Sequence, residues 1–131
     1  MSRIPTRQTI FAAKAAAGTG NPVEVKSFKN VGLDFRTASG ADLTVKIQAS
    51  FSETAPDFSS APSDTNSWFY CGVWDLDSVA AVAGSTGFGI GGVDVVYGLL
   101  LNVDNVNWVC ATITAYAAGN LSLDTISVTN Q

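Results

Sequence analysis

The sequence has 131 residues, of which 47% are hydrophobic and 14% are charged. This length suits one domain with one hydrophobic core, and the charged fraction is well below the usual value of about 25%. The chain has no histidine and two cysteines, which excludes Ser-His-Asp triads, His-based metal sites and four-thiolate zinc sites. We therefore expect a protein that is not an enzyme, holds no cofactor and has an unusually uncharged surface.

Charge is distributed unevenly along the chain. Residues 1–29 carry five basic residues against one acidic residue, a net charge of +4. Residues 30–131 carry two basic residues against ten acidic ones, a net charge of −8. This asymmetry predicts a basic N-terminal arm, residues 1–20, on an acidic domain, residues 21–131. Such an arm either docks onto an acidic partner, including another copy of the chain, or is a solvated tail.

The N-terminal region allows three interpretations. Arg3 and Arg7 precede a short apolar run at residues 10–18, as in a secretory signal, but Lys14 interrupts that run. Residues 9–14 fit an edge strand, and their alanines also fit a short helix.

Residues 22–28 alternate between apolar and polar types, with Pro22 at the first position, and predict a short strand.

The clearest strand signal lies at residues 42–51, where every odd position is apolar and nearly every even position is polar. Residues 31–36 alternate in the same way. The connection at residues 37–41 is short and contains Gly40, so we predict that the two segments form a hairpin.

Residues 52–66 contain two prolines and many serine, threonine, aspartate and asparagine residues, which predicts a long surface loop. Loops of this length in a compact domain are uncommon and are often functional. Phe58 is the large apolar residue within it. Its side chain is expected either to fold back onto the body or to contact a neighbouring protein.

The second half of the chain predicts further strands joined by turns. Residues 66–76 form an aromatic strand with apolar groups on both faces, as in a central strand or one covered by a partner. Glycine-rich residues 80–92 predict a turn, a short strand and a bulged loop, and strands follow at 93–101, 108–116 and 121–128. In the last strand the apolar positions change phase, which predicts a bulge near Asp124. The resulting fold class is all-β, an antiparallel β-sandwich of jelly-roll type with an extended N-terminal arm.

Few residues support small-molecule chemistry. Asp75 and Asp77 are two positions apart and suit either a calcium site or a solvated turn, and we favour the turn. Cys71 and Cys110 are expected to be buried free thiols, although a disulfide across the sandwich is the alternative. Several aromatic residues offer stacking surfaces for sugar rings, so a tail- or fibre-associated carbohydrate-binding module is the alternative function: Trp68, Tyr70, Trp74, Tyr97, Trp108 and Tyr116.

Two segments, residues 32–51 and residues 108–123, resemble the strands of small virion proteins from tailed bacteriophages. The resemblance covers about half of the chain and includes no diagnostic motif. It implies a structural virion protein of the capsid cement (decoration) type, which binds and stabilises the assembled phage head. It supplies no catalytic residues.

This resemblance sets the expected partners and contacts. The partners are the major capsid protein or other virion proteins, together with further copies of the chain in a dimer or trimer. The protein is then assembled in the host cytoplasm and located on the capsid surface. Nucleic acid and membrane are not expected, because the body is acidic and no segment reaches the ~20 apolar residues of a transmembrane helix. The expected partner-binding residues are Arg3, Arg7, Ile10, Phe11, Phe58 and Trp68. A secreted adhesin-like domain, cleaved after residues 15–17, is a further alternative.

Overall fold

The computed structural model describes the backbone of residues 3–130 and the side chains of residues 6–127. Every regular element in this range is a β-strand, and none of it forms a helix long and apolar enough to cross a membrane. The strands are β1 (Arg3–Lys14), β2 (Gly18–Thr19), β3 (Val23–Glu24), β4 (Asn30–Ser50), β5 (Phe69–Tyr70), β6 (Val73–Asp75), β7 (Ala80–Val82), β8 (Phe88–Gly91), β9 (Val96–Asn102) and β10 (Trp108–Asn130).

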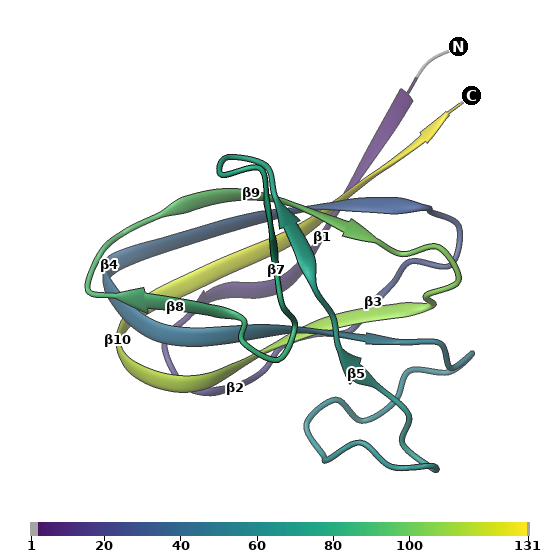
Figure 1. Ribbon diagram of the computed structural model, residues 1–131, viewed down its shortest axis with the longest axis horizontal. Coiled ribbons are helices and arrows are strands. Elements are labelled where there is room, and N and C mark those ends of the chain that lie inside the picture. Colours follow the sequence, from purple (N-terminus) through teal and green to yellow (C-terminus); the bar gives the residue numbers. More distant parts are fainter. Residues whose placement is uncertain (1–2, 131) are drawn as a thin grey trace.

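The described strands form one antiparallel sheet that folds over on itself (Figure 1). β4 and β10 are 21 and 23 residues long, pair with each other along most of their length and pass through both layers. The first layer has the order β1-β10-β4-β9-β6-β7, and the second contains β2, β3, β5 and β8 on the other halves of β4 and β10. The predicted all-β, antiparallel sandwich is confirmed. In a jelly roll, two separate sheets pack face to face. Here the two long strands β4 and β10 run through both layers and join them.

The fold of the sheet occurs where β4 and β10 bend together. Ser39, Gly40 and Gly119 have positive φ angles of 63°, 67° and 77°. A Cβ atom on Gly119 would lie 2.7 Å from both the Ala38 carbonyl oxygen and the Ala41 amide nitrogen. The two bends therefore touch, and only glycine at position 119 allows this approach.

This bend corrects the predicted hairpin. Segments 31–36 and 42–51 are both extended, as predicted, but they do not pair with each other. Asn120 pairs with Ala38 and Ala118 pairs with Asp42, so both segments belong to one strand that lies along β10. The physical reason is that residues 38–41 bend a continuous strand between layers instead of turning it back within one.

The core lies between the two layers. Odd-numbered side chains of β4 point inward before and after the bend, as the alternation predicts. Phe35 is fully buried. The centroid of its ring lies 5.3 Å from the ring centroid of Phe88 and 5.5 Å from that of Tyr97. The largest fully buried side chains are Ile10, Leu33, Phe35, Ile47, Leu99, Leu101, Ile113, Leu121 and Leu123.

The N-terminal region differs from the separate arm expected over residues 1–20. β1 pairs with β10 from Arg3 opposite Asn130 to Lys14 opposite Leu121, and β2 also pairs with β10. A register shift between Thr9 and Phe11 lets two consecutive residues, Ile10 and Phe11, face the core. The start of β1 does extend from the body, but it does so paired with the end of β10 (Figure 1). Burying these two large side chains is what ties the segment to the sheet.

The end of β10 corrects a second detail. Its register with β4 is unbroken from Asn120 to Ile126, so the bulge predicted near Asp124 does not occur in this strand. The irregularity lies instead in the neighbouring strand β1. Thr125 and Ser127 occupy the inward positions and are buried, and the Thr125 hydroxyl lies 3.4 Å from the Gln8 carbonyl oxygen that accepts its hydrogen bond.

The predicted strand at residues 66–76 is two short strands. β5 pairs with β4 in the second layer, whereas β6 pairs with β9 and β7 in the first. Between them the Cys71 amide donates a hydrogen bond of 2.8 Å to the Ile47 carbonyl oxygen. This crossing carries β6 and β7 to one end of the strand order.

Candidate protein-interaction face

Exposed large apolar side chains gather on β6, on Leu76 directly after it, and on β9. Trp74 and Leu76 are 41% and 53% exposed, and Val96 and Leu100 are 75% and 37% exposed. In both strands the alternate residues, such as Val73 and Leu99, are buried in the core. We call Trp74, Leu76, Val96 and Leu100 the β6–β9 face. Contiguous exposed apolar groups of this kind mark interaction sites in soluble proteins.

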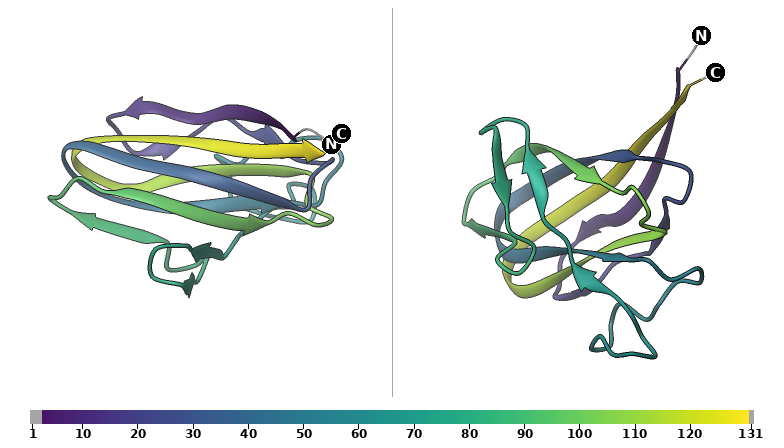
Figure 2. Two further views of the ribbon diagram at one scale, coloured as in Figure 1. Left: turned by 90° about the horizontal axis from the view of Figure 1, so that it is seen from above. Right: turned by 45° about the vertical axis from the view of Figure 1, so that its right-hand side comes forward.

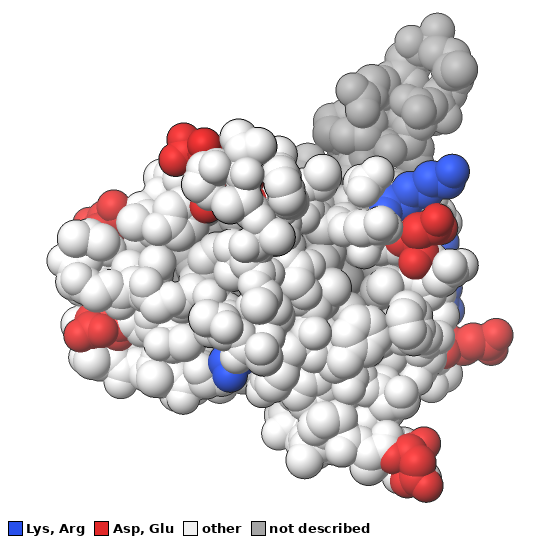
Figure 3. Space-filling view, viewed as in Figure 1, with Lys and Arg blue, Asp and Glu red and all other residues white. Residues whose placement is uncertain are grey.

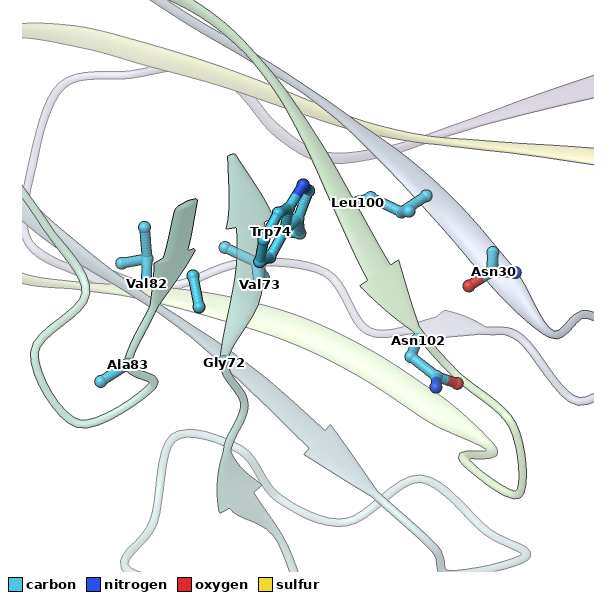
Figure 4. Close-up of a pocket in the computed structure, with 9 residues that line it drawn as sticks. Asn30, Gly72, Val73, Trp74, Val82, Ala83, Leu100 and Asn102 are labelled. Carbon is cyan, nitrogen blue, oxygen red and sulfur yellow. The ribbon is translucent and has the colours of Figure 1, made fainter. Parts of the chain in front are cut away.

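The strand register brings the residues of this face together. Trp74 lies opposite Ala81 of β7 on one side and opposite Leu100 of β9 on the other, and Figure 4 shows Trp74 beside Leu100. The Leu76 amide donates to the Gly98 carbonyl oxygen at 3.0 Å, and the Leu76 side chain reaches the space above this glycine. The face is therefore continuous from β6 to β9, and Ala81 of β7 borders it.

A groove of about 640 Å³ adjoins the face and is predominantly apolar. The amides of Asn30 and Asn102 lie at one end of it (Figure 4). It is lined by Asn30, Gly72, Val73, Trp74, Ala81, Val82, Ala83, Leu100 and Asn102. With no titratable side chain in this lining, the groove is suited to packing against apolar groups.

The strand beside the groove is an unprotected edge. Among the described strands, β7 ends the strand order of its layer and pairs with β6 alone. Its residues, Ala80 to Val82, carry neither the charge nor the proline with which proteins usually protect exposed edges. Figure 3, seen from the same side as Figure 1, shows an uncharged middle with most of the visible acidic side chains toward the outline. An uncharged middle with charges toward the rim fits the usual anatomy of a protein interface, whose core is depleted of charged residues and whose rim is polar.

Four of the sequence-predicted contact residues are buried in the free protein. Ile10 and Phe11 belong to the main core. Phe58 and Trp68 are 3% and 8% exposed and form a second, small cluster with Cys110. Of the two alternatives for Phe58, the structure therefore shows the one in which the loop folds back on the body. The burial of these side chains follows from their size, since each removes a large apolar area from water.

The predicted long loop is ordered by its own polar groups. The Asp57 carboxylate accepts hydrogen bonds from Ser59 and Ser60, and these bonds hold the pKa of Asp57 below its usual value, the Ser59 hydroxyl contributing most. The Asn66 side chain donates to the Asp57 carbonyl oxygen at 2.8 Å, and the Trp68 indole donates to the Ser60 carbonyl oxygen at 2.9 Å. The loop is a compact unit held to the body by Phe58.

Arg7, another predicted contact residue, is engaged within the molecule. Its guanidinium lies 2.6 Å from Asp124 and 3.1 Å from Asp34, and Arg36 lies 2.8 Å from Asp124. The cluster joins β1, β4 and β10 on the outside of the first layer. Arg3 pairs with Asn130 through the backbone, and its side chain lies outside the described residues.

This cluster predicts a pH dependence of stability. Burial acts to raise the pKa of Asp124, but hydrogen bonds from Thr9 and Arg7 and the charges of Arg36 and Arg7 outweigh it, so the pKa is lowered. A lowered pKa stabilises the folded state above the unfolded value of about 3.9, and this stabilisation is lost as the pH falls through the folded value. We expect Asp124→Asn to reduce the free energy of unfolding at pH 7 by about 2 kcal/mol.

Urea denaturation at pH 7 and at pH 3 checks this expectation. The difference between wild type and Asp124→Asn should shrink at the lower pH, whereas Asp64→Asn, in the exposed loop, should match wild type at both. A difference that is the same at both pH values would contradict a role for the Asp124 charge.

The other predicted chemical groups are dispersed or structural. Asp75 accepts hydrogen bonds from the backbone amides of Asp77 and Ser78, as in a turn, and the described residues contain no cluster of three potential metal ligands. Cys71 and Cys110 are free thiols, and burial raises the pKa of Cys110 to about 11.

The aromatic residues considered for sugar binding do not form one platform. Trp68 and Tyr70 contact each other in the second layer, with ring centroids 5.1 Å apart. Trp74 lies on the other layer, and Tyr97 packs against Phe35 and Phe88. A smaller cavity of about 280 Å³ lies beside Trp68 and Tyr70, under the loop.

Sequence reasoning did not select the β6–β9 face, although a signal was present. Apolar residues on both sides of residues 66–76 are typical of a strand covered by a partner. Only the pairing of β6 with β9 brings Leu100, more than twenty residues away, next to Trp74.

The chain is thus an all-β sandwich protein, built from one folded sheet and presenting an apolar face at one sheet edge. Comparison with protein-family models and with curated protein sequences gives no match. Among solved structures, the fold is similar to the crystal structure of the SPBc2 prophage-derived protein YomS, with a TM-score of 0.70 and 11% sequence identity. The similarity covers 98% of this chain and 96% of that one, so the two proteins share a fold over their whole length.

Proposed function

We propose that this protein is a non-catalytic structural component of a bacteriophage particle, of the capsid cement (decoration) type. In this role it binds the assembled head and stabilises it. Its partners are the major capsid protein or other particle proteins, and its place is the capsid surface.

The observation that carries the proposal is the exposed β6–β9 face beside an unprotected edge strand. Leaving Trp74 and Leu76 in water lowers solubility and exposes the protein to aggregation, so a protein gains from such a face when a partner covers it. The whole-chain similarity of fold to a prophage-derived protein supports placing that partner in a phage particle. The sparse charge of the chain fits a protein with much of its surface covered by neighbours.

Such a protein stabilises the particle by mass action. A protein that binds only the assembled particle lowers the free energy of that state, by an amount that grows with its concentration relative to its dissociation constant. The affinity is expected to come from a few buried aromatic and aliphatic side chains at the centre of the contact. Trp74 is the strongest candidate for such a residue because it is the largest side chain of the face and is half exposed in the free protein.

Two measurements test the proposal. Mass spectrometry of purified virions should find the protein at high copy number. Particles lacking the protein should bind it when it is added back and should then resist heat or chelator better.

Trp74→Ser combined with Leu76→Ser should weaken particle binding at least about tenfold, because central apolar contacts dominate interface affinity. Phe51→Ser is the matched control, since Phe51 is an exposed aromatic residue that lies outside the β6–β9 face. Equal binding by both variants would contradict the assignment of the face, and absence from virions would overturn the proposed function.

A further inference from the structure

We infer that the cavity under the loop at residues 52–66 binds one neutral sugar ring, whose hydroxyl groups hydrogen-bond to the protein. This is the cavity of about 280 Å³ beside Trp68 and Tyr70. It shares no lining residue with the β6–β9 face or with the groove beside that face. A sugar site here is therefore independent of the proposed particle role.

The floor of the cavity is the outer side of the second layer. Gln48 of β4 and Thr112 of β10 occupy even-numbered positions, whose side chains point away from the core. Gln48 lies opposite Tyr70 of β5, and Thr112 lies opposite Thr19 of β2. Residues 58–62 of the loop form the other side of the cavity. Figure 2 shows this loop extending beyond the sheet where β4 ends and β5 begins.

Gln48 supplies a buried hydrogen-bond acceptor at the inner end of the cavity. The residue is 1% exposed, and its Nε2 donates a hydrogen bond of 2.9 Å to the Phe58 carbonyl oxygen. This bond fixes the orientation of the amide, because the reverse orientation would place two oxygen atoms against each other. Oε1 is then buried, and no donor among the described residues reaches it. Such an acceptor is costly without a partner, and a ligand hydroxyl in the cavity can donate to it.

The threonine hydroxyls of the floor are also available to a ligand. The Thr19 hydroxyl lies 3.3 Å from the Thr112 hydroxyl, and the Thr112 hydroxyl lies 3.4 Å from the Gly18 carbonyl oxygen. The Thr114 hydroxyl lies 3.5 Å from the Thr44 carbonyl oxygen. These distances are long for bonds between a hydroxyl and an oxygen atom, so the internal bonds are weak. A ligand with several hydroxyl groups can replace them.

The remaining chemistry of the cavity selects a neutral ligand with an apolar face. None of the described residues that line it is charged: Thr19, Gln48, Phe58, Ser59, Ser60, Ala61, Pro62, Trp68, Tyr70, Thr112 and Thr114. A charged ligand would lose its hydration without gaining a partner. The Lys46 ammonium, 5.0 Å from the centroid of the Tyr70 ring, further disfavours a cation.

The rings of Trp68 and Tyr70 suit the C–H groups of a sugar ring. The volume is just below the range of about 300–1,000 Å³ that is usual for small-molecule sites, so it accepts a single ring. This ring is either a free monosaccharide or the end unit of a glycan, and both present the same hydroxyl groups.

NMR titration of the ¹⁵N-labelled protein with glucose, galactose, mannose and N-acetylglucosamine tests the site. At least one sugar should shift the signals of the Gln48 side-chain amide and the Trp68 indole, with a Kd on the order of 1 mM for a ligand of this size. The Trp74 indole signal should stay unchanged, because Trp74 does not line this cavity. If none of the four sugars shifts the Gln48 and Trp68 signals, the sugar site is wrong.

Variants of the lining separate binding in the cavity from binding elsewhere. Gln48→Met keeps the length of the side chain, removes the buried acceptor and should weaken binding at least about tenfold. Tyr70→Ala, at an exposed position, should weaken binding about fivefold and decides the matter if Gln48→Met does not fold. Phe51→Ala is the matched control, since Phe51 is an exposed aromatic residue outside the cavity. Equal affinities of Tyr70→Ala and Phe51→Ala would overturn the assignment of the cavity.

Two further ligands define the chemical class. A disaccharide that ends in the bound sugar should bind as tightly as the monosaccharide if the site takes the end of a glycan, and more weakly if it takes the free sugar. Either result supports a sugar site. Ethanolamine, which combines a hydroxyl group with a positive charge, should leave all signals unchanged. Shifts with ethanolamine but with none of the sugars would contradict a neutral ligand.

Discussion

Replacing Gly119 with alanine is expected to destabilise the protein by more than about 3 kcal/mol, or to prevent folding. Gly119 has a φ of 77°, in the left-handed region that an alanine side chain disfavours. The added methyl group would also lie 2.7 Å from the Ala38 carbonyl oxygen and the Ala41 amide nitrogen. These are backbone atoms, so relief requires the bend of β4 to move away from the bend of β10.

Gly40→Ala is the matched control for this prediction. Gly40 has a similar φ of 67°, but no atom lies within 4 Å of the position its Cβ would occupy. It should therefore cost only the conformational penalty, about 1 kcal/mol. Denaturant unfolding followed by circular dichroism measures both variants. Equal losses would show that the two bends do not depend on close contact at Gly119.

Replacing Phe58 with alanine is expected to reduce the free energy of unfolding by about 3 kcal/mol. Phe58 is 3% exposed and packs against Trp68, with ring centroids 6.1 Å apart. The carbonyl oxygen of Phe58 also accepts a hydrogen bond of 2.9 Å from the buried Gln48 side chain. Removing the ring leaves a cavity at the point where the loop is held to the body.

Phe51→Ala is the matched control, because Phe51 is 60% exposed and contacts Phe69 at the surface. It should cost less than about 1 kcal/mol. Limited proteolysis should cut residues 52–66 faster in Phe58→Ala than in wild type or in Phe51→Ala. If Phe58 were instead a contact residue for a partner, its removal would leave stability and proteolysis unchanged.

Local patterns in the sequence predicted the strands well because they depend on residues close to one another. The alternation at residues 42–51 identifies one buried face, and the core uses that face as far as Ala49, whereas Phe51 is exposed. Proline, serine and aspartate in residues 52–66 predicted the loop for a similarly local reason. The candidate face was not predicted, because its members Trp74 and Leu100 meet only through the pairing of β6 with β9.

The sequence and the tertiary structure determine different features of this protein, and the basic N-terminal segment shows both. Composition established a sparsely charged chain without histidine, and the order of residues predicted an all-β fold and placed the excess of positive charge before residue 30. The tertiary structure decided that Ile10 and Phe11 enter the core, that residues 30–50 form one bent strand and that Trp74 remains exposed. These features depend on which strands pair and where a chain bends, and both are decided by contacts between residues distant in sequence.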